Sequence, residues 1–270
     1  MDRITSLENG LHVRGSFTIP SGITEFPPSL IAESVGQLAA WASMSALNFE
    51  RRPVAGLAGG IELLGTVHPG QTLELSADIE TVDLEAVAYG GMAQADGVPV
   101  IRLENCVGPM APGAEFDDAN ALRERFALLC GPGATSCTFP GVPVIALERT
   151  GGEGGRSARA NLQVPAIADF FGDHFPRKPV FPGTLLMNKN LELVAALSAE
   201  IPPPANRRSW TITSVSDVKL RAFIPPGQAL EIESKLDERS DNAAVLLVQT
   251  RMEKKLVGSA WVHLTSGGKT

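Results

Sequence analysis

The sequence predicts an α+β chain built from two units of the same design, each an antiparallel sheet packed against one long helix. A proline-rich approach runs into an apolar helix twice, at residues 26–37 and at residues 179–197. A Pro-Gly-Gln turn leads into an alternating strand twice as well, at residues 69–71 and 226–228. Two helix-plus-sheet units in one chain indicate an internal duplication.

The length of the chain, 270 residues, allows one large domain or two small ones. A net charge of −7 gives no indication of nucleic acid or of an anionic membrane as a partner. The three cysteines lack a CxxC spacing, so we expect neither a disulfide framework nor a metal site, and a reducing cytoplasm fits best. The amino-terminal residues show no signal pattern, and no apolar run approaches membrane-spanning length.

The first unit is expected to span residues 1–112. Residues 1–20 alternate loosely and read as edge strands, and the helix follows Phe26-Pro27. Further strands are expected after the first Pro-Gly-Gln turn, at residues 86–93 and 99–107. A linker at 113–135 carries a short helix at 119–129, which Asp117 or Asp118 caps and Gly131-Pro132-Gly133 terminates.

The second unit is expected to span residues 136–270. It opens with strands at 144–148 and 158–164, separated by the glycine-rich turn 151–155. Its helix starts at Gly183 and stops at the three prolines that follow Ile201. The second Pro-Gly-Gln turn and strands at 244–252 and 256–264 complete the unit.

The stretch that precedes the second helix reads DHFPRKPVFPGTLLMNKNLE and spans residues 173–192. Its prolines fix φ and remove amide donors, so the approach to the helix is stiff and extended. It delivers His174 next to a helix N-terminus, where unpaired amides can stabilise negative charge on an oxygen. The pattern therefore indicates a candidate catalytic segment.

The run HFPRKPVFPG, from His174 to Gly183, resembles the active-site segment of the hotdog-fold 3-hydroxyacyl-ACP dehydratases. In that family the pattern is roughly HFPxxPxxPG, and a catalytic Glu or Asp follows five residues after the glycine. Asn188 stands there in this sequence. The first helix matches the family's FPxxLxxExxxQ better, with Glu33 at the acidic position and Gln37 one turn later on the same face.

The resemblance implies a double hotdog with one composite site between its two units. Roughly ten residues, which include the histidine position, are missing between Pro20 and the first helix. In the family, each site combines a histidine from one subunit with an acid from the other. His174 with Glu33 would therefore form one working site, and the site with Asn188 and no histidine would be inactive.

The implied activity is that of a lyase (EC 4.2.1 type) that dehydrates 3-hydroxyacyl thioesters to trans-2-enoyl thioesters in fatty acid or polyketide-type synthesis. His174 would remove the C2 proton, and Glu33, kept protonated or sharing a proton through its apolar surroundings, would assist departure of the hydroxyl. The Gly183 amide would bind the thioester carbonyl, and Gln37 would orient Glu33 or a water. The expected acyl site is lined by Val35, Phe181, Pro182, Leu186 and Met187. This chemistry needs neither a metal nor an organic cofactor.

The expected partner is a substrate thioester on acyl carrier protein or CoA, with no nucleic acid and no membrane. An acidic carrier would need a basic rim around the site. The candidates for that rim are Arg177, Lys178, Lys189, Arg207, Arg208 and Arg221. Association of two such chains into a homodimer stays open.

Three alternatives remain. An acyl thioesterase would use Glu33 to activate water, and a CoA-linked enoyl hydratase would run the same chemistry in reverse. A decayed acyl-binding or partner module is consistent with Asn188 and with the missing first histidine. Glu192 falls where the family has glutamine, so a hydrogen-bonding or surface role is expected for it before an acidic one. The resemblance implies that the acyl chain lies in a tunnel between the two central helices. A pocket with His174 within reach of Glu33 would weigh against decay, whereas side chains that fill this tunnel would support it.

Overall fold

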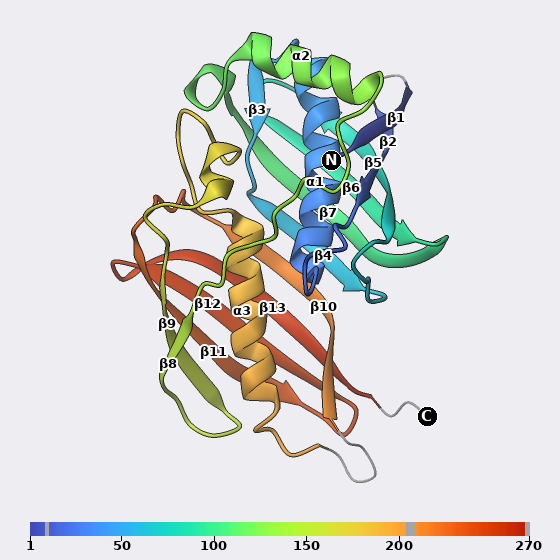
Figure 1. Ribbon diagram of the computed structural model, residues 1–270. Coiled ribbons are helices and arrows are strands. Elements are labelled where there is room, and N and C mark those ends of the chain that lie inside the picture. Colours follow the sequence, from blue (N-terminus) through green and yellow to red (C-terminus); the bar gives the residue numbers. More distant parts are fainter. Residues whose placement is uncertain (9–10, 204–208, 268–270) are drawn as a thin grey trace. The chain divides into compact units, whose positions relative to one another are not determined.

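The computed structural model describes residues 1–8, 11–203 and 209–267. The chain forms two compact units (Figure 1). Unit 1 comprises Met1–Val142 together with Gly172–Pro179, and unit 2 comprises Pro143–Phe171 together with Val180–Thr270. Each unit has its own antiparallel sheet and one long helix, as the sequence predicts.

Unit 1 has the strand order β1-β2-β5-β6-β7-β4, and β3 pairs with the far end of β7. The long helix α1 packs against this sheet, and the shorter helix α2 covers the end of α1 (Figure 1). The elements are β1 (Arg3–Glu8), β2 (His12–Thr18), α1 (Pro28–Ala46), β3 (Arg51–Pro53), β4 (Leu57–Leu63), β5 (Thr72–Val82), β6 (Ala86–Ala95), β7 (Val98–Pro112), η1 (Gly113–Glu115) and α2 (Ala119–Cys130).

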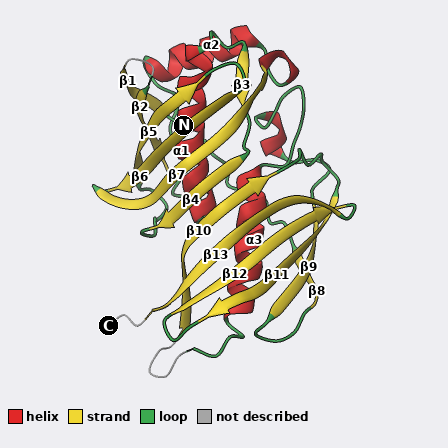
Figure 2. Cartoon of the chain, turned by 180° about the vertical axis from the view of Figure 1, so that it is seen from behind, coloured by secondary structure: helices red, strands yellow, loops and turns green. Residues whose placement is uncertain are grey.

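Unit 2 repeats this topology with the strand order β10-β13-β12-β11-β9-β8. Figure 2 shows these strands from the side opposite to α3, which packs on their other face. The elements are β8 (Leu147–Gly151), β9 (Ser157–Gln163), η2 (Asp169–Gly172), α3 (Gly183–Ser198), β10 (Ser209–Leu220), β11 (Ala229–Arg239), β12 (Ala243–Met252) and β13 (Lys255–Gly267). A hairpin, a helix, a further strand and a three-stranded meander therefore follow one another in both units, and unit 1 has the additional short strand β3 directly after its helix.

The two Pro-Gly-Gln turns accept an equivalent backbone hydrogen bond: the Ile19 amide donates to the Gln71 carbonyl and the Val164 amide donates to the Gln228 carbonyl, each at 2.9 Å. The glycine amides of the two turns donate to acceptors that differ by one residue. Gly70 adopts a φ of 88° and its amide donates to the Ile19 carbonyl at 2.8 Å. Gly227 adopts a φ of 77° and donates to the Pro165 carbonyl at 3.2 Å. A positive φ favours glycine, which explains why both turns carry glycine at this position. The duplication that the sequence indicates thus extends to individual backbone contacts.

Alternation along the strands sets which side chains enter each core. In β5, Leu73, Leu75 and Ala77 are buried while the residues between them face outward. In β11, Leu230 and Ile232 follow the same pattern. Because successive side chains in a strand point to opposite faces, one apolar face of each sheet is left to pack against its helix.

The residues expected to form a linker instead belong to unit 1. Asp118 caps α2 by accepting from the amides of Asn120 and Ala121 at 2.9 and 3.1 Å. The helix packs through Leu122 against Met44 and Phe49 at the end of α1. The segment Gly172–Pro179 also groups with unit 1, whereas the expected boundaries put it in the second unit.

Three strands have no counterpart among the expected elements: β3, β4 and β10. Two glycines weaken the strand pattern of β4, and serine and threonine do so in β10. The strand β8 begins three residues later than the expected start at Val144, which is fully exposed. Among the residues that the structure describes, no helix is long and apolar enough to cross a membrane.

Candidate active site

The His174 segment is fastened to the end of β7 and the residues after it. The Arg177 amide donates to the Phe116 carbonyl at 3.0 Å, and the Arg177 guanidinium donates to the Asp118 carboxylate at 3.1 Å. Phe175 and Lys178 close a tight turn through two backbone hydrogen bonds of 3.4 and 3.2 Å. These contacts explain why the segment groups with unit 1.

The imidazole of His174 stacks on the phenyl ring of Phe175, with ring centres 4.2 Å apart and an angle of 23° between the planes. His174 is half-buried, whereas Phe175 is buried. Phe116 meets the Phe175 ring edge-on at 5.1 Å. The imidazole therefore rests on an aromatic pair that is itself part of the unit 1 core.

A buried ion pair lies beside this aromatic pair. Arg52, on β3, pairs with Asp117, and only 17% and 10% of their side chains are exposed. The Arg52 guanidinium also lies 4.2 Å from the centre of the Phe175 ring. Burial raises the pKa of the Asp117 carboxyl, and the positive charges of Arg52, Arg177 and His174 oppose that shift.

Glu33 lies in the second turn of α1, where it is half-buried. The side-chain amide of Gln37 donates to the Glu33 Oε1 atom at 2.9 Å, as expected for residues four apart on one helix face. Glu33 also influences Arg52, because its negative charge opposes the lowering of the Arg52 pKa that burial causes. Glu33 and His174 therefore both interact electrostatically with the Arg52–Asp117 pair, and all four residues belong to unit 1.

A further polar group lies beneath α1. Tyr89, on β6, places its hydroxyl 3.3 Å from where a Cβ atom on Gly36 would stand. Burial raises the pKa of Tyr89, and the charges of Cys106 and Glu33 raise it further, so the phenol keeps its proton at neutral pH. Cys106 is the cross-strand neighbour of Tyr89. Tyr89 is the only tyrosine in the chain, yet sequence reasoning missed it.

The first copy has no histidine segment ahead of its helix. Another part of unit 1, the segment that follows α2, packs near the start of α1 instead. Phe139, which follows α2, lies 6.1 Å from Phe26 and 6.3 Å from Phe17, measured between ring centres. Phe26 precedes α1 as Phe181 precedes α3, and Phe181 has Phe170 at 6.1 Å. The phenylalanine ahead of the long helix thus has an aromatic partner in both copies. The partner follows α2 in the first copy and precedes α3 in the second.

Of the other predicted site residues, all but Val35 lie in unit 2. Gly183 is the first residue of α3, and Pro182 precedes it as the N-cap. A Cβ atom on Gly183 would come within 2.3 Å of the Leu220 side chain. Phe181 is buried and its amide donates to the Ile224 carbonyl at 2.7 Å. Packing alone therefore gives a reason for glycine at position 183, beside the amide role expected for it.

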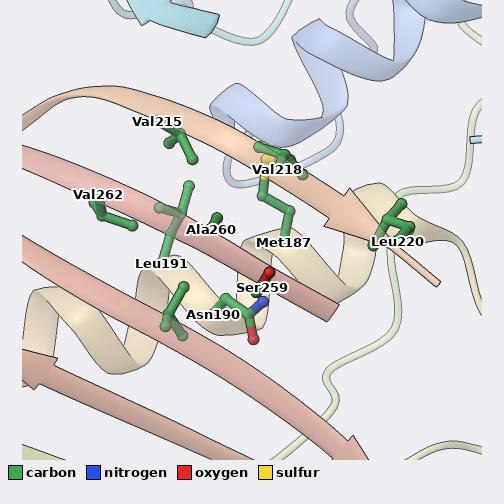
Figure 3. Close-up of a pocket in the computed structure, with 11 residues that line it drawn as sticks. Met187, Asn190, Leu191, Val215, Val218, Leu220, Ser259, Ala260 and Val262 are labelled. Atoms are coloured by element: carbon green, nitrogen blue, oxygen red, sulfur yellow. The ribbon is translucent and has the colours of Figure 1, made fainter. Parts of the chain in front are cut away.

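A small cavity lies between α3 and the sheet of unit 2, with a volume of about 10 Å³ (Figure 3). Met187, Asn190 and Leu191 line it from the helix, and Val218 and Ala260 line it from the strands. This volume has room for about one water molecule and none for an acyl chain. An acyl chain could enter only if side chains such as Met187, which is unbranched and flexible, moved aside.

Two residues expected to line the acyl site are core residues in separate units. Val35 is fully buried in α1 of unit 1. Leu186 is 1% exposed in α3, close to Gly258 of β13. Of the residues expected to line the acyl site, only Met187 borders the unit 2 cavity. Gly183, which was expected to bind the thioester carbonyl, borders it as well.

The α3 position that corresponds to Glu33 carries Asn188, as the sequence shows. Its side-chain amide donates to the Glu192 Oε1 atom at 3.0 Å. Lys189 also binds Glu192, at 2.7 and 3.0 Å. The Glu192 carboxylate is thus held by an amide and an ammonium group.

The basic residues expected to form a rim have polar partners where the structure describes them. Arg177 pairs with Asp118 and Lys178 pairs with Glu115 at 2.9 Å. Lys189 pairs with Glu192, and Arg221 donates to the Ser259 hydroxyl at 2.9 Å. Arg207 and Arg208 lie outside the described residues.

Comparison with solved structures establishes the class of fold. The chain covers 100% of a Lactobacillus plantarum structure assigned as an oleoyl thioesterase, with a TM-score of 0.64 at 8% identity over 98% of this chain. It covers 100% of an acyl-ACP thioesterase from Bacteroides thetaiotaomicron, with a TM-score of 0.56 at 14% identity over 96% of this chain. The protein is a double hotdog, with one sheet and one central helix in each unit.

Sequence comparison then indicates the family. Residues 151–259 match the model of the ApeI-like dehydratases. The 3-hydroxyacyl-[acyl-carrier-protein] dehydratase FabZ of Rickettsia typhi is 31% identical over 72 residues, which are 27% of this chain and 50% of that protein. FabZ of Lactobacillus helveticus is 24% identical over 106 residues, which are 39% of this chain and 71% of that protein. Parts of the chain are therefore similar to the ApeI-like dehydratases and to 3-hydroxyacyl-[acyl-carrier-protein] dehydratases.

The sequence match is partial in both directions. The chain spans half the length of the Rickettsia typhi relative, and the matched family region lies within residues 151–259. Most of unit 1, with Glu33, Arg52 and Tyr89, lies outside that region. Among the described residues, no three His, Cys, Asp or Glu side chains gather into a group that could hold a metal ion.

Proposed function

We propose that this protein interconverts 3-hydroxyacyl and trans-2-enoyl thioesters, with His174 and Glu33 as its proton-transferring pair. One observation carries the proposal: the Arg52–Asp117 pair of unit 1 interacts electrostatically with both residues, Arg52 with Glu33 and Asp117 with His174. Each sequence repeat supplies one of the two groups. The family match supports the reaction class, because the related proteins are named as dehydratases.

The reaction needs a base and an acid at the same pH. In dehydration, His174 removes the proton from C2, and the electrons of that C–H bond form the C2–C3 double bond. The C3–oxygen bond then breaks, and Glu33 donates a proton so that the hydroxyl leaves as water. Hydration is the same sequence in reverse.

Neighbouring groups would position Glu33 for this role. Gln37 donates a hydrogen bond to the Glu33 Oε1 atom and so restricts the orientation of the carboxyl group. The Tyr89 phenol keeps its proton and can donate a hydrogen bond in the same region. Binding of the thioester carbonyl by the Gly183 amide stays a prediction, as does the acyl site at Val35, Phe181, Pro182, Leu186 and Met187.

Acyl carrier protein is the proposed carrier of the substrate, because the related FabZ enzymes are named for carrier-bound substrates. A CoA thioester has the same reacting atoms and is the second candidate. Parallel assays with the same acyl group on each carrier distinguish the two.

Thioester hydrolysis is the second candidate function. The double-hotdog structures that align over nearly the whole chain are named as thioesterases. In that reaction Glu33 would activate a water for attack on the thioester carbonyl, and a free acid would be released. Identities of 8% and 14% limit that support to the fold.

The product distinguishes these candidates. The purified protein is incubated with a 3-hydroxyacyl-ACP, and with the matching trans-2-enoyl-ACP, and the products are resolved by mass spectrometry. We expect the two thioesters to interconvert with loss or gain of water. Free acid with no enoyl product would establish thioesterase activity, and binding without turnover would establish an acyl-binding module.

A further inference from the structure

The His174 imidazole and the Arg52 guanidinium share one aromatic neighbour. The His174 ring centre and the Arg52 Cζ atom each lie 4.2 Å from the centre of the Phe175 ring. Phe175 is buried and Phe116 fixes its edge at 5.1 Å. The orientation of the imidazole therefore depends on where Phe175 lies, and the position of Phe175 depends on Arg52 and Phe116.

The chain segment after η1 holds both sides of this arrangement. The Asp117 carboxylate binds the Arg52 guanidinium. The neighbouring Asp118 binds the Arg177 guanidinium at 3.1 Å, and the Phe116 carbonyl accepts from the Arg177 amide at 3.0 Å. Three consecutive residues thus fix the turn that carries Phe175 and the cation that packs on it.

Stability alone is a weak reason for this ion pair. Arg52 and Asp117 are 17% and 10% exposed, so both groups have lost most of their hydration. Replacement of a buried ion pair by apolar side chains of similar volume is often neutral or stabilising. Arg52 also sits on the three-residue strand β3, which pairs with β7 with or without this side chain.

We propose that Arg52, oriented by Asp117, is a positioning residue for His174 and acts through the Phe175 ring. Arg52 holds the ring, and the ring holds the imidazole at the orientation needed for proton transfer. The inference rests on the proposed function for its catalytic consequence, whereas the positioning itself can be measured without turnover.

The catalytic test uses Arg52→Ala, with Arg102→Ala as the matched control, because Arg102 forms an exposed pair with Glu62 in the same unit. Misplacement of a catalytic group by 1 Å costs about 10²-fold in rate, so Arg52→Ala should lower kcat by about 10- to 100-fold with little change in KM. Millimolar methylguanidinium should restore part of the lost kcat, because it can occupy the vacated site between Asp117 and Phe175.

Rescue separates positioning from a purely structural role. A variant that is merely destabilised gains nothing from methylguanidinium, since guanidinium salts weaken folding. The control Arg102→Ala should keep its kcat and show no rescue. An Arg52→Ala enzyme with unchanged kcat, or with a loss that methylguanidinium fails to restore, would overturn the catalytic inference.

The second readout is the NMR signal of the His174 ring in histidine-labelled protein, assigned with His174→Gln. Stacking on Phe175 should shift the His174 ring protons through the ring current, and Arg52→Met, which keeps apolar volume, should reduce that shift. If the wild type turns over no thioester but this change appears, the positioning holds and the proposed function fails. If Arg52→Met folds and the His174 signal is unchanged, the positioning is refuted.

Discussion

Glu33 and Asn188 occupy the same position in two helices of one design. Each stands five residues after the first residue of its helix, and each is hydrogen-bonded to the side chain four positions later. In α1 the pair is a glutamate followed by glutamine, whereas in α3 it is an asparagine followed by glutamate. The duplication thus kept a carboxylate–amide pair in both helices and exchanged its order.

This exchange predicts unequal effects of two matched substitutions. Glu192→Gln removes a carboxylate that is exposed and paired with Lys189, so the free energy of unfolding should change by less than about 1 kcal/mol. Turnover should stay within about twofold of the wild type, because general acid–base groups contribute 10²- to 10⁴-fold and Glu192 has no such part. Glu33→Gln should lose activity by orders of magnitude. Equal losses in the two variants, measured with enoyl-ACP, would contradict the assignment of Glu33.

Tyr89→Phe removes the hydroxyl beneath α1 and leaves the ring. Because the phenol keeps its proton at neutral pH, we expect it to act as a hydrogen-bond donor near Glu33. Loss of one such bond should lower kcat by about tenfold and change the free energy of unfolding by about 1 kcal/mol. Steady-state kinetics and urea unfolding measure the two effects separately. An unchanged kcat would remove Tyr89 from the site.

Gly183→Ala tests the packing of the first turn of α3. The new methyl group would come within 2.3 Å of the Leu220 Cδ1 atom, so Leu220 must move. Overpacking of this kind typically costs 1–3 kcal/mol, and we expect about 1–2 kcal/mol because the contact is with a side-chain end. Addition of Leu220→Ala should remove that penalty in urea unfolding. A single variant as stable as the wild type would show that the contact is relieved without cost.

The Cys106 thiol predicts a loss of stability at alkaline pH. Burial raises its pKa from 9.0 to about 11 in the folded protein. The unfolded chain therefore releases this proton first as the pH rises, so the contribution is complete below pH 9 and is lost as the pH approaches 11. A difference of about two pKa units corresponds to about 3 kcal/mol.

Unfolding of the wild type and of Cys106→Ala should be compared from about pH 8 to pH 11. The wild-type free energy of unfolding should fall more steeply than that of the variant across this window. The charge of Cys106 contributes to the raised pKa of Tyr89, so the comparison measures the Cys106 contribution together with its coupling to Tyr89. Parallel curves would mean that Cys106 titrates alike in the folded and unfolded chains.

Much of the fold could be predicted because it is encoded by local patterns. The Pro-Gly-Gln turns, the alternating strands and the two proline-to-helix junctions each depend on neighbouring residues, and all appear in the structure. The strands β4 and β10 were missed because glycine, serine and threonine obscure their alternation. Their pairing with distant strands, β7 and β13, determines their conformation instead.

The candidate site was only partly predictable for the same reason. His174 and Glu33 stand in recognisable motifs, so their residue types and spacing identify them. Arg52 and Tyr89 stand in no motif, and their proximity to the site depends on how β3 and β6 pack in unit 1. Membership of the His174 segment in unit 1 also depends on long-range contacts with Phe116 and Asp118 that no local pattern reports.

The central claim is that His174 and Glu33 act as one site. The most direct test measures hydration of a trans-2-enoyl-ACP by the wild type, by His174→Ala, by Glu33→Gln and by the double variant. His12→Ala serves as control, because His12 is an exposed histidine paired with Asp78. We expect each single variant to lose about 10²- to 10⁴-fold and the double variant to lose little more, since residues that act as a unit are strongly non-additive. Full activity in either single variant, or losses that multiply in the double variant, would contradict a shared site.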